Sequence, residues 1–112
     1  MDVAVLPKEY AIISGFMFHL PEEHNKFKTL KLNPKYFSTP MTKALAQIVT
    51  HTMEKHDVCN ELATESYLMK SGAYNAAQYT EVLASTPLDY AGVKHQYDEL
   101  KRIYAGRMLN AA

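Results

Sequence analysis

Five histidines and one cysteine are the residues of this sequence best suited to bind a metal ion or to act as nucleophiles. His19 and His24 are five residues apart, and so are His51 and His56. On a helix this spacing separates two side chains by ~140° around the axis, so the pair does not share a face. Zinc prefers a spacing such as i, i+4 with further ligands at hand. We therefore expect solvated or half-buried histidines, no metal site and no cofactor.

The carboxylates and Cys59 lack the partners that acid–base or nucleophilic catalysis requires. Glu22–Glu23 and Asp98–Glu99 are adjacent pairs, so their side chains point in different directions around a helix. Glu61 and Glu65 share a face, but they lie near a helix start, where the helix dipole stabilises negative charge. Cys59 has no histidine in a recognisable catalytic pattern, so we expect it to be a small core residue.

Nucleotide-binding motifs are also missing. The glycines are widely separated, at Gly15, Gly72, Gly92 and Gly106. Neither a G-x-x-x-x-G-K-[ST] phosphate loop nor a G-x-G-x-x-G fingerprint can be formed from them. We therefore expect no nucleotide hydrolysis, no catalytic residues and no enzymatic activity for this chain alone.

A periodic row of apolar residues near the end of the chain is a candidate self-association seam. Its members follow one another at alternating steps of three and four: Tyr90, Val93, Tyr97, Leu100 and Tyr104. Such heptad-like spacing is typical of helix–helix contacts, although two heptads are too few to indicate a coiled coil. Tyrosine suits interfaces because one end of its side chain is apolar and the other tolerates water. Packing within the domain is the alternative, more so for Tyr97 than for Tyr104.

The net charge of zero conceals a basic half and an acidic half. No acidic residue occurs between Glu23 and Glu54, and this span contains a candidate basic surface of Lys26, Lys28, Lys31, Lys35 and Lys43. Between Asp57 and Glu99, by contrast, acidic residues outnumber lysines by seven to two. The lysines could contact the phosphates of a nucleic acid, dock against an acidic protein surface, or simply keep the helices soluble.

The spacing of apolar residues is helical nearly throughout, and no alternating stretch indicates a strand. A first helix is predicted after Pro7, with Leu6, Tyr10, Ile13, Met17 and Leu20 on one stripe and Pro21 as its end. A short helix with Phe27 and Leu30 follows. Later helices are predicted from Pro40, from about 60 to 70, from about 76 to 84 with Tyr79, Val82 and Leu83 inward, and from Asp89 onward. We thus predict an all-α bundle of about six helices.

Size and composition are those of one globular domain spanning residues 1–112. The chain is 47% hydrophobic and 21% charged, and it contains no apolar stretch of the ~18 residues that a membrane span requires. Met1–Leu6 has no basic n-region and no long apolar h-region, so we do not expect it to be a signal peptide. A single cysteine fits a reducing compartment. We expect a cytoplasmic protein without membrane contact.

Four segments carry a family resemblance. They read LPKEYAIISGFMF, LNPKYFSTPMTKALAQIV, KHDVCNELATESYL and YTEVLASTPLDYAGVKHQYDELKR. In order and spacing, over most of the chain from about Pro7 to Met108, they resemble the N-terminal domain of DnaB-type replicative DNA helicases. The sequence departs from the family pattern at Thr42, where a histidine is frequent, and at Cys59, where an aspartate is usual.

The resemblance implies a non-catalytic helical collar of a hexameric helicase. In that family the domain pairs through a helical hairpin, whose first arm would here be the helix carrying Tyr90 to Tyr104. The collar supports assembly of dimers into the hexamer and docks the C-terminal domain of primase and, in some systems, a loader. ATP hydrolysis belongs to a separate RecA-like domain that this chain lacks, and DNA contact by the collar is weak or indirect.

Two other functions stay open. One is a stand-alone regulatory or phage protein of the same fold that binds a helicase or primase. The other is a small DNA-binding module that uses the lysine-rich span, whose affinity would fall steeply with salt. The last predicted helix contains no terminal glycine, proline or cap before Ala112. We interpret this as a chain cut within a helix and expect the natural protein to be longer.

Overall fold

The computed structural model describes residues 5–56 and 59–111, and helices account for most of them. The elements are α1 (Val5–Met17), the 3-10 turn η1 (Pro21–Glu23), α2 (His24–Thr29), the 3-10 turn η2 (Pro34–Tyr36), α3 (Pro40–His56), α4 (Glu61–Ser71), α5 (Ala76–Ala84) and α6 (Tyr90–Ala111). No strand occurs among the described residues, so the prediction of an all-α bundle of about six helices is confirmed. None of the described helices has both the length and the apolar character needed to cross a bilayer.

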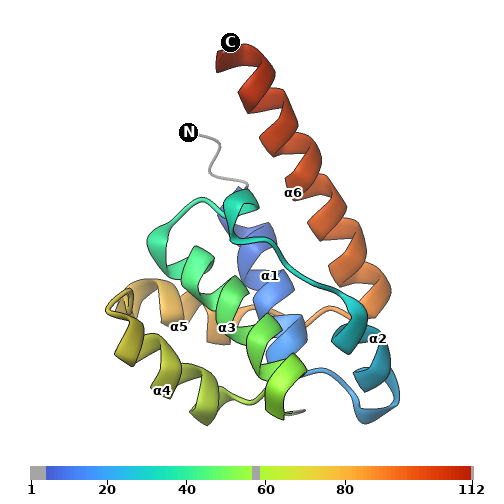
Figure 1. Ribbon diagram of the computed structural model, residues 1–112, viewed down its shortest axis with the longest axis vertical. Helices are drawn as coiled ribbons and strands as arrows, with labels where there is room; N and C mark the ends of the chain where they lie inside the picture. The colour runs from blue at the N-terminus through green and yellow to red at the C-terminus, as the bar shows by residue number, and fades with distance from the viewer. Residues whose placement is uncertain (1–4, 57–58, 112) are drawn as a thin grey trace.

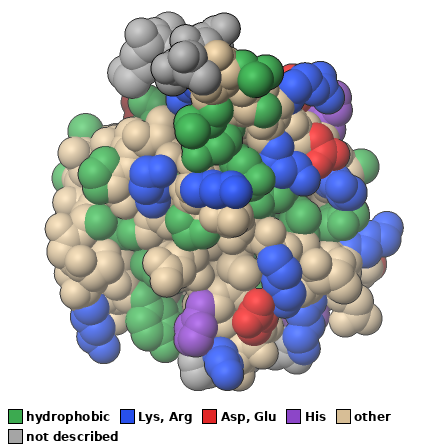
Figure 2. Space-filling view, turned by 45° about the horizontal axis from the view of Figure 1, so that its top comes forward, with side chains coloured by type: hydrophobic (Ala, Val, Ile, Leu, Met, Phe, Trp, Pro, Cys, Tyr) green, Lys and Arg blue, Asp and Glu red, His purple; other side chains and the backbone are tan. Residues whose placement is uncertain are grey.

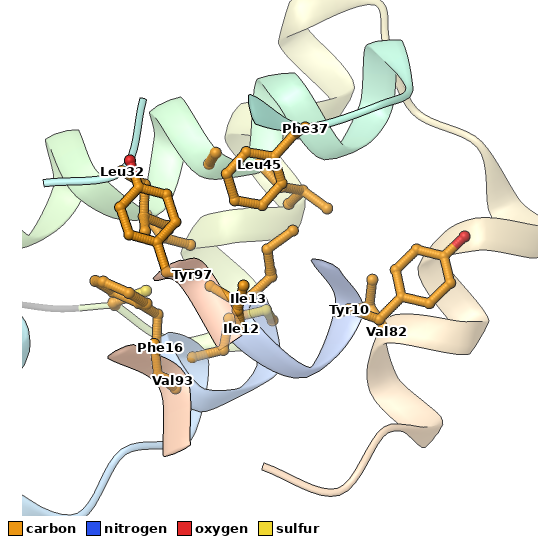
Figure 3. Close-up of a cluster of buried hydrophobic side chains, with 14 of the residues drawn as sticks. Tyr10, Ile12, Ile13, Phe16, Leu32, Phe37, Leu45, Val82, Val93 and Tyr97 are labelled. Atoms are coloured by element: carbon orange, nitrogen blue, oxygen red, sulfur yellow. The ribbon is translucent and has the colours of Figure 1, made fainter. Parts of the chain in front are cut away.

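Helix α1 lies at the centre of the bundle because it is apolar on nearly every side. Ile12, Ile13 and Phe16 are fully buried, and the helix contacts α3, α5 and α6 (Figure 1). A helix that is hydrophobic all round needs neighbours on all sides. Figure 3 shows the resulting core, in which α1 side chains meet residues such as Leu45 and Val93 from the surrounding helices.

Local capping fixes where the helices start and stop. Thr39 and Thr42 form a reciprocal cap at the start of α3, since each backbone N–H donates to the other's Oγ1 at 3.1 Å. The Asn60 side chain caps α4 by accepting from the backbone N of Ala63 at 2.8 Å. Gly72, with φ of 79°, adopts the left-handed conformation that ends the same helix. These boundaries agree with the sequence-based prediction.

Two leucines that were predicted to face the core are exposed. Leu20 is 56% exposed because α1 ends at Met17 instead of continuing to Pro21. A proline disfavours helical backbone in the residue before it, and Pro21 here begins the separate turn η1. Leu83 is 37% exposed, since it lies ~100° around α5 from Val82, the residue that is fully buried.

The long helix α6 packs along α1 and its C-terminal part extends past the rest of the bundle (Figure 1). The segment that contains η2 crosses the bundle between α3 and α6 and is fixed from both sides. Tyr97 of α6 accepts a hydrogen bond at its hydroxyl oxygen from the backbone N of Asn33 at 2.8 Å. Glu9 of α1 accepts from the backbone N of Ser38 at 3.0 Å. These hydrogen bonds fix the position of the η2 segment relative to both α6 and α1.

Candidate functional site

The predicted self-association seam is the inner face of α6. Val93, Tyr97 and Leu100 are each at most 5% exposed and belong to the chain's own core. Burial raises the pKa of Tyr97, whose hydroxyl group is bonded to the loop before η2. Because these three side chains are already covered, they are not accessible to a second copy. For Val93, Tyr97 and Leu100, the structure thus supports packing within the domain, the alternative to a self-association seam.

Only the two ends of the seam reach the surface. Tyr90 is half-buried, and its ring packs edge-on against Phe27 with centroids 5.6 Å apart. Tyr104 is half-buried at the other end and packs edge-on against Tyr36, with centroids 5.2 Å apart. The Tyr104 end lies where α6 meets the η2 segment, and Tyr104 lines an open groove there.

The lysine-rich span does not form a single uniform surface. Lys31 forms an ion pair with Glu54 at 3.0 Å, and its hydrogen bond lowers the pKa of that carboxyl group. Lys26 and Lys28 belong to the short helix α2, where Lys28 is half-buried. Lys35 and Lys43 are the two members of the span that meet the end of the seam.

These residues come together in an open groove between the η2 segment and α6, here called the basic groove. It has a volume of about 290 Å³ and is lined by Lys35, Tyr36, Phe37, Ser38, Lys43, Tyr104, Arg107 and Met108. Figure 2 turns this end of the molecule toward the viewer and shows Lys and Arg side chains beside hydrophobic ones. The groove thus has an aromatic and apolar floor with cationic edges.

The three cations of the basic groove are differently constrained. The Lys43 ammonium group donates to the carbonyl oxygens of Pro34, at 3.4 Å, and Phe37. Lys35 lies over the ring of Tyr36 with its Nζ 5.1 Å from the centroid, and Arg107 is exposed. Among the described residues, none of the three cations forms an ion pair with a carboxylate. Within the described part of the chain, the positive charge of the groove is therefore not compensated by a carboxylate.

Sequence reasoning missed two residues that make this site. Glu9 is a fully buried carboxylate that binds Ser38 on the groove wall. Arg107 follows Tyr104 by three residues, so it lies on the same side of α6. That spacing is visible in the sequence, but it places Arg107 in the groove only because Tyr104 faces the η2 segment. Nothing in the sequence indicates the pairing of Glu9 with Ser38.

The histidine prediction is partly wrong. His19 and His24 are half-buried as expected, but they do not diverge, because His19 lies beyond the end of α1. Their Nε2 and Nδ1 atoms are 2.8 Å apart and their rings stack. The described residues contain no group of three or more side chains suited to hold a metal ion.

Cys59 is buried, as predicted for a core residue. Burial raises the pKa of its thiol to about 11, so the thiolate is scarce at neutral pH and the side chain is a poor nucleophile. Of the acidic half, Glu61 and Glu81 are exposed on α4 and α5. Asp57 lies outside the described residues.

No match to this chain was found among models of protein families, among curated proteins or among solved structures. Chemically, cations beside apolar and aromatic side chains are an arrangement that can attract and orient a ligand of opposite charge.

Proposed function

We propose that this chain is a non-catalytic docking and assembly domain of a replicative DNA helicase. Its role would be to support the helicase ring and to dock the C-terminal domain of primase, or a loader, in the cytoplasm. The assignment to a helicase is supported by the order of four sequence segments that resemble the DnaB-type N-terminal domain. An all-helical bundle of the described residues is the fold class that this resemblance implies.

The basic groove is the observation that carries the docking function. It brings residues from two distant parts of the chain, Lys35 and Lys43 on one side and Tyr104 and Arg107 on the other, into one open surface. The apolar floor would supply binding free energy when water leaves it, and the cations would steer and orient the partner. Beyond the groove, Leu109 of α6 is 79% exposed and extends the apolar area.

Two binding measurements test this function directly. Sedimentation velocity over a range of concentrations measures self-association, and isothermal titration calorimetry measures binding of the primase C-terminal domain from the same source. We expect at least one of them to report association. A chain that stays monomeric at every concentration and gives no heat with the primase domain would overturn the proposal.

The runner-up is a stand-alone regulatory or phage protein that uses the same groove to bind a helicase or primase. Both proposals assign the same binding surface, and they differ in whether the gene also encodes a helicase domain. The open reading frame downstream of codon 112 distinguishes them: a following RecA-like domain with a G-x-x-x-x-G-K-[ST] motif supports the helicase, and a stop codon supports the stand-alone protein.

A further inference from the structure

The basic groove also indicates what kind of ligand it accepts. We infer that it binds an acidic protein segment with one large apolar side chain, which inserts between Tyr104 and Met108 while flanking carboxylates contact the cations. This inference rests on the proposed docking function and names the chemistry of the partner.

Among the residues that the structure describes, no carboxylate pairs with the positive charge at the groove. Lys35, Lys43 and Arg107 line the same groove, and none has a carboxylate partner among the residues that the structure describes. An ammonium group has three donors, and Lys43 uses two of them on backbone carbonyls, so one donor is left for a ligand. The Arg107 guanidinium can hold a carboxylate through two parallel hydrogen bonds.

The floor of the groove suits one apolar side chain. Met108 is 55% exposed there, next to the half-buried ring of Tyr104. A volume of about 290 Å³ is at the small end of ligand sites and matches a single large side chain with part of its backbone. Aromatic and arginine groups around such a pocket are typical of the anchor positions that dominate protein–protein binding.

The same geometry disfavours a single-stranded nucleic acid. Such ligands need exposed ring faces on which successive bases stack. Tyr36 is covered by the Lys35 ammonium group, and its ring packs edge-to-face with Tyr97 and Tyr104. The rings are therefore used to build the floor of the groove, and they do not form a row of stacking platforms. An acidic peptide needs only the apolar floor and the cations.

Fluorescence anisotropy with a labelled peptide tests the inference. The probe is a short peptide with one phenylalanine between pairs of glutamates, and the two comparison peptides replace either the phenylalanine with serine or the glutamates with glutamine. We expect binding of the probe to be weakened about tenfold by either replacement, and to weaken further as salt is added. Equal binding of the glutamine peptide would overturn the inference.

Charge-reversed proteins locate the binding site. Lys35→Glu and Arg107→Glu should each weaken the probe about threefold to tenfold, because each replaces an exposed attraction with a repulsion. The matched control is Arg102→Glu, an exposed arginine of the same helix that does not line the groove. Met108→Ser should weaken the phenylalanine peptide and leave the serine peptide unchanged. Circular dichroism and urea unfolding confirm that each variant is folded.

Three results would contradict the inference. The probe could fail to bind, it could respond equally to Arg102→Glu and Arg107→Glu, or oligothymidylate could bind more tightly than the peptide and lose that binding in Arg107→Glu. The last result would assign the groove to nucleic acid. Arg107→Glu could weaken primase binding or self-association even though the peptide does not bind. In that case the proposed acidic ligand is wrong, and the proposed docking function is still supported. If the peptide binds but neither primase binding nor self-association is detected, the proposed ligand class is supported and the proposed docking function is wrong.

Discussion

The buried carboxylate of Glu9 holds Ser38 through two hydrogen bonds, one from the Ser38 backbone N at 3.0 Å and one from the Ser38 hydroxyl at 2.7 Å. Glu9 is fully buried on the central helix, and Ser38 lines the basic groove. The pair therefore links the core of the bundle to the wall of the candidate docking surface, across 29 residues of sequence.

Removing this link should loosen the groove. Glu9→Ala is expected to lower the free energy of unfolding by about 2 kcal/mol, since two hydrogen bonds to Ser38 are lost and a cavity remains. Glu9→Gln keeps one acceptor oxygen and should lose less. Urea unfolding measures both variants. An unchanged midpoint for Glu9→Ala would show that the pair contributes nothing to stability.

The close approach of α1 and α6 at Gly15 gives a second prediction. A Cβ atom on Gly15 would lie 2.5 Å from Cγ2 of Val93 and 3.0 Å from the carbonyl oxygen of Leu88. Gly15→Ala should therefore destabilise the protein by about 1–3 kcal/mol through overpacking. Gly106→Ala is the control, because nothing lies within 4 Å of its Cβ position.

The control should change stability in the opposite direction. Alanine in place of a helical glycine stabilises by about 0.5–1 kcal/mol when its side chain meets no obstacle. Thermal unfolding of the two variants should thus move the midpoint down for Gly15→Ala and up for Gly106→Ala. Similar midpoints for both would contradict the packing of α1 against α6.

Two buried threonines differ in whether their hydroxyl groups are satisfied. Thr52 is 2% exposed, and its Oγ1 is the one buried side-chain polar atom of the described residues without a hydrogen-bond partner. An unsatisfied buried hydroxyl costs about 1–3 kcal/mol, so Thr52→Val should raise the free energy of unfolding. Thr42, in contrast, uses its Oγ1 in the cap of α3.

Thr42→Val should consequently lower the free energy of unfolding by about 1 kcal/mol, because the backbone N–H of Thr39 loses its acceptor. Chemical unfolding of both valine variants against the parent chain tests the contrast. A loss of stability in Thr52→Val would indicate that its hydroxyl group has a partner after all.

Alkaline pH should destabilise the fold through Cys59. Burial raises the pKa of its thiol to about 11 from the ordinary value of 9.0. Between these values the unfolded state has lost the proton that the folded state retains, so stability falls as pH rises through this window. The loss at pH ~10 is roughly 1 kcal/mol.

Cys59→Ala removes this titration and should make the fall in stability between pH ~9 and ~11 shallower. Tyr79, with its pKa raised to about 12 by burial and by nearby acidic groups, gives a smaller loss of the same sign that persists in the variant. Urea unfolding midpoints of the parent and of Cys59→Ala, measured across this pH range, test the prediction. A parallel profile for the variant and the parent would rule out the thiol as the cause.

Helix positions were predictable from the sequence because their signals are local. Asn60 and Gly72 fix the ends of α4 through atoms a few residues away. The periodic seam was also visible, but periodicity shows which face of a helix is apolar and not what covers it. The buried position of Tyr97 depends on α1 and on the loop at Asn33, which is 64 residues distant.

The basic groove could not be predicted for the same reason. Lys35 and Arg107 are far apart in sequence, and their proximity depends on how the η2 segment is held against α6. The histidine pair shows the converse error. A helical wheel applied to His19 and His24 assumed one continuous helix, whereas α1 ends at Met17 and the chain folds back to bring the two rings together.

Amide hydrogen exchange of the chain alone and in complex with the primase C-terminal domain tests whether the basic groove is the docking surface. We expect slower exchange on binding in residues 33–43 and 103–109, the two segments that form and flank the basic groove, with little change in α4 and α5. Arg107→Glu should reduce that protection, and Arg102→Glu should leave it intact. Protection confined to α4 and α5, or equal protection in the two variants, would contradict the assignment of the basic groove as the docking surface.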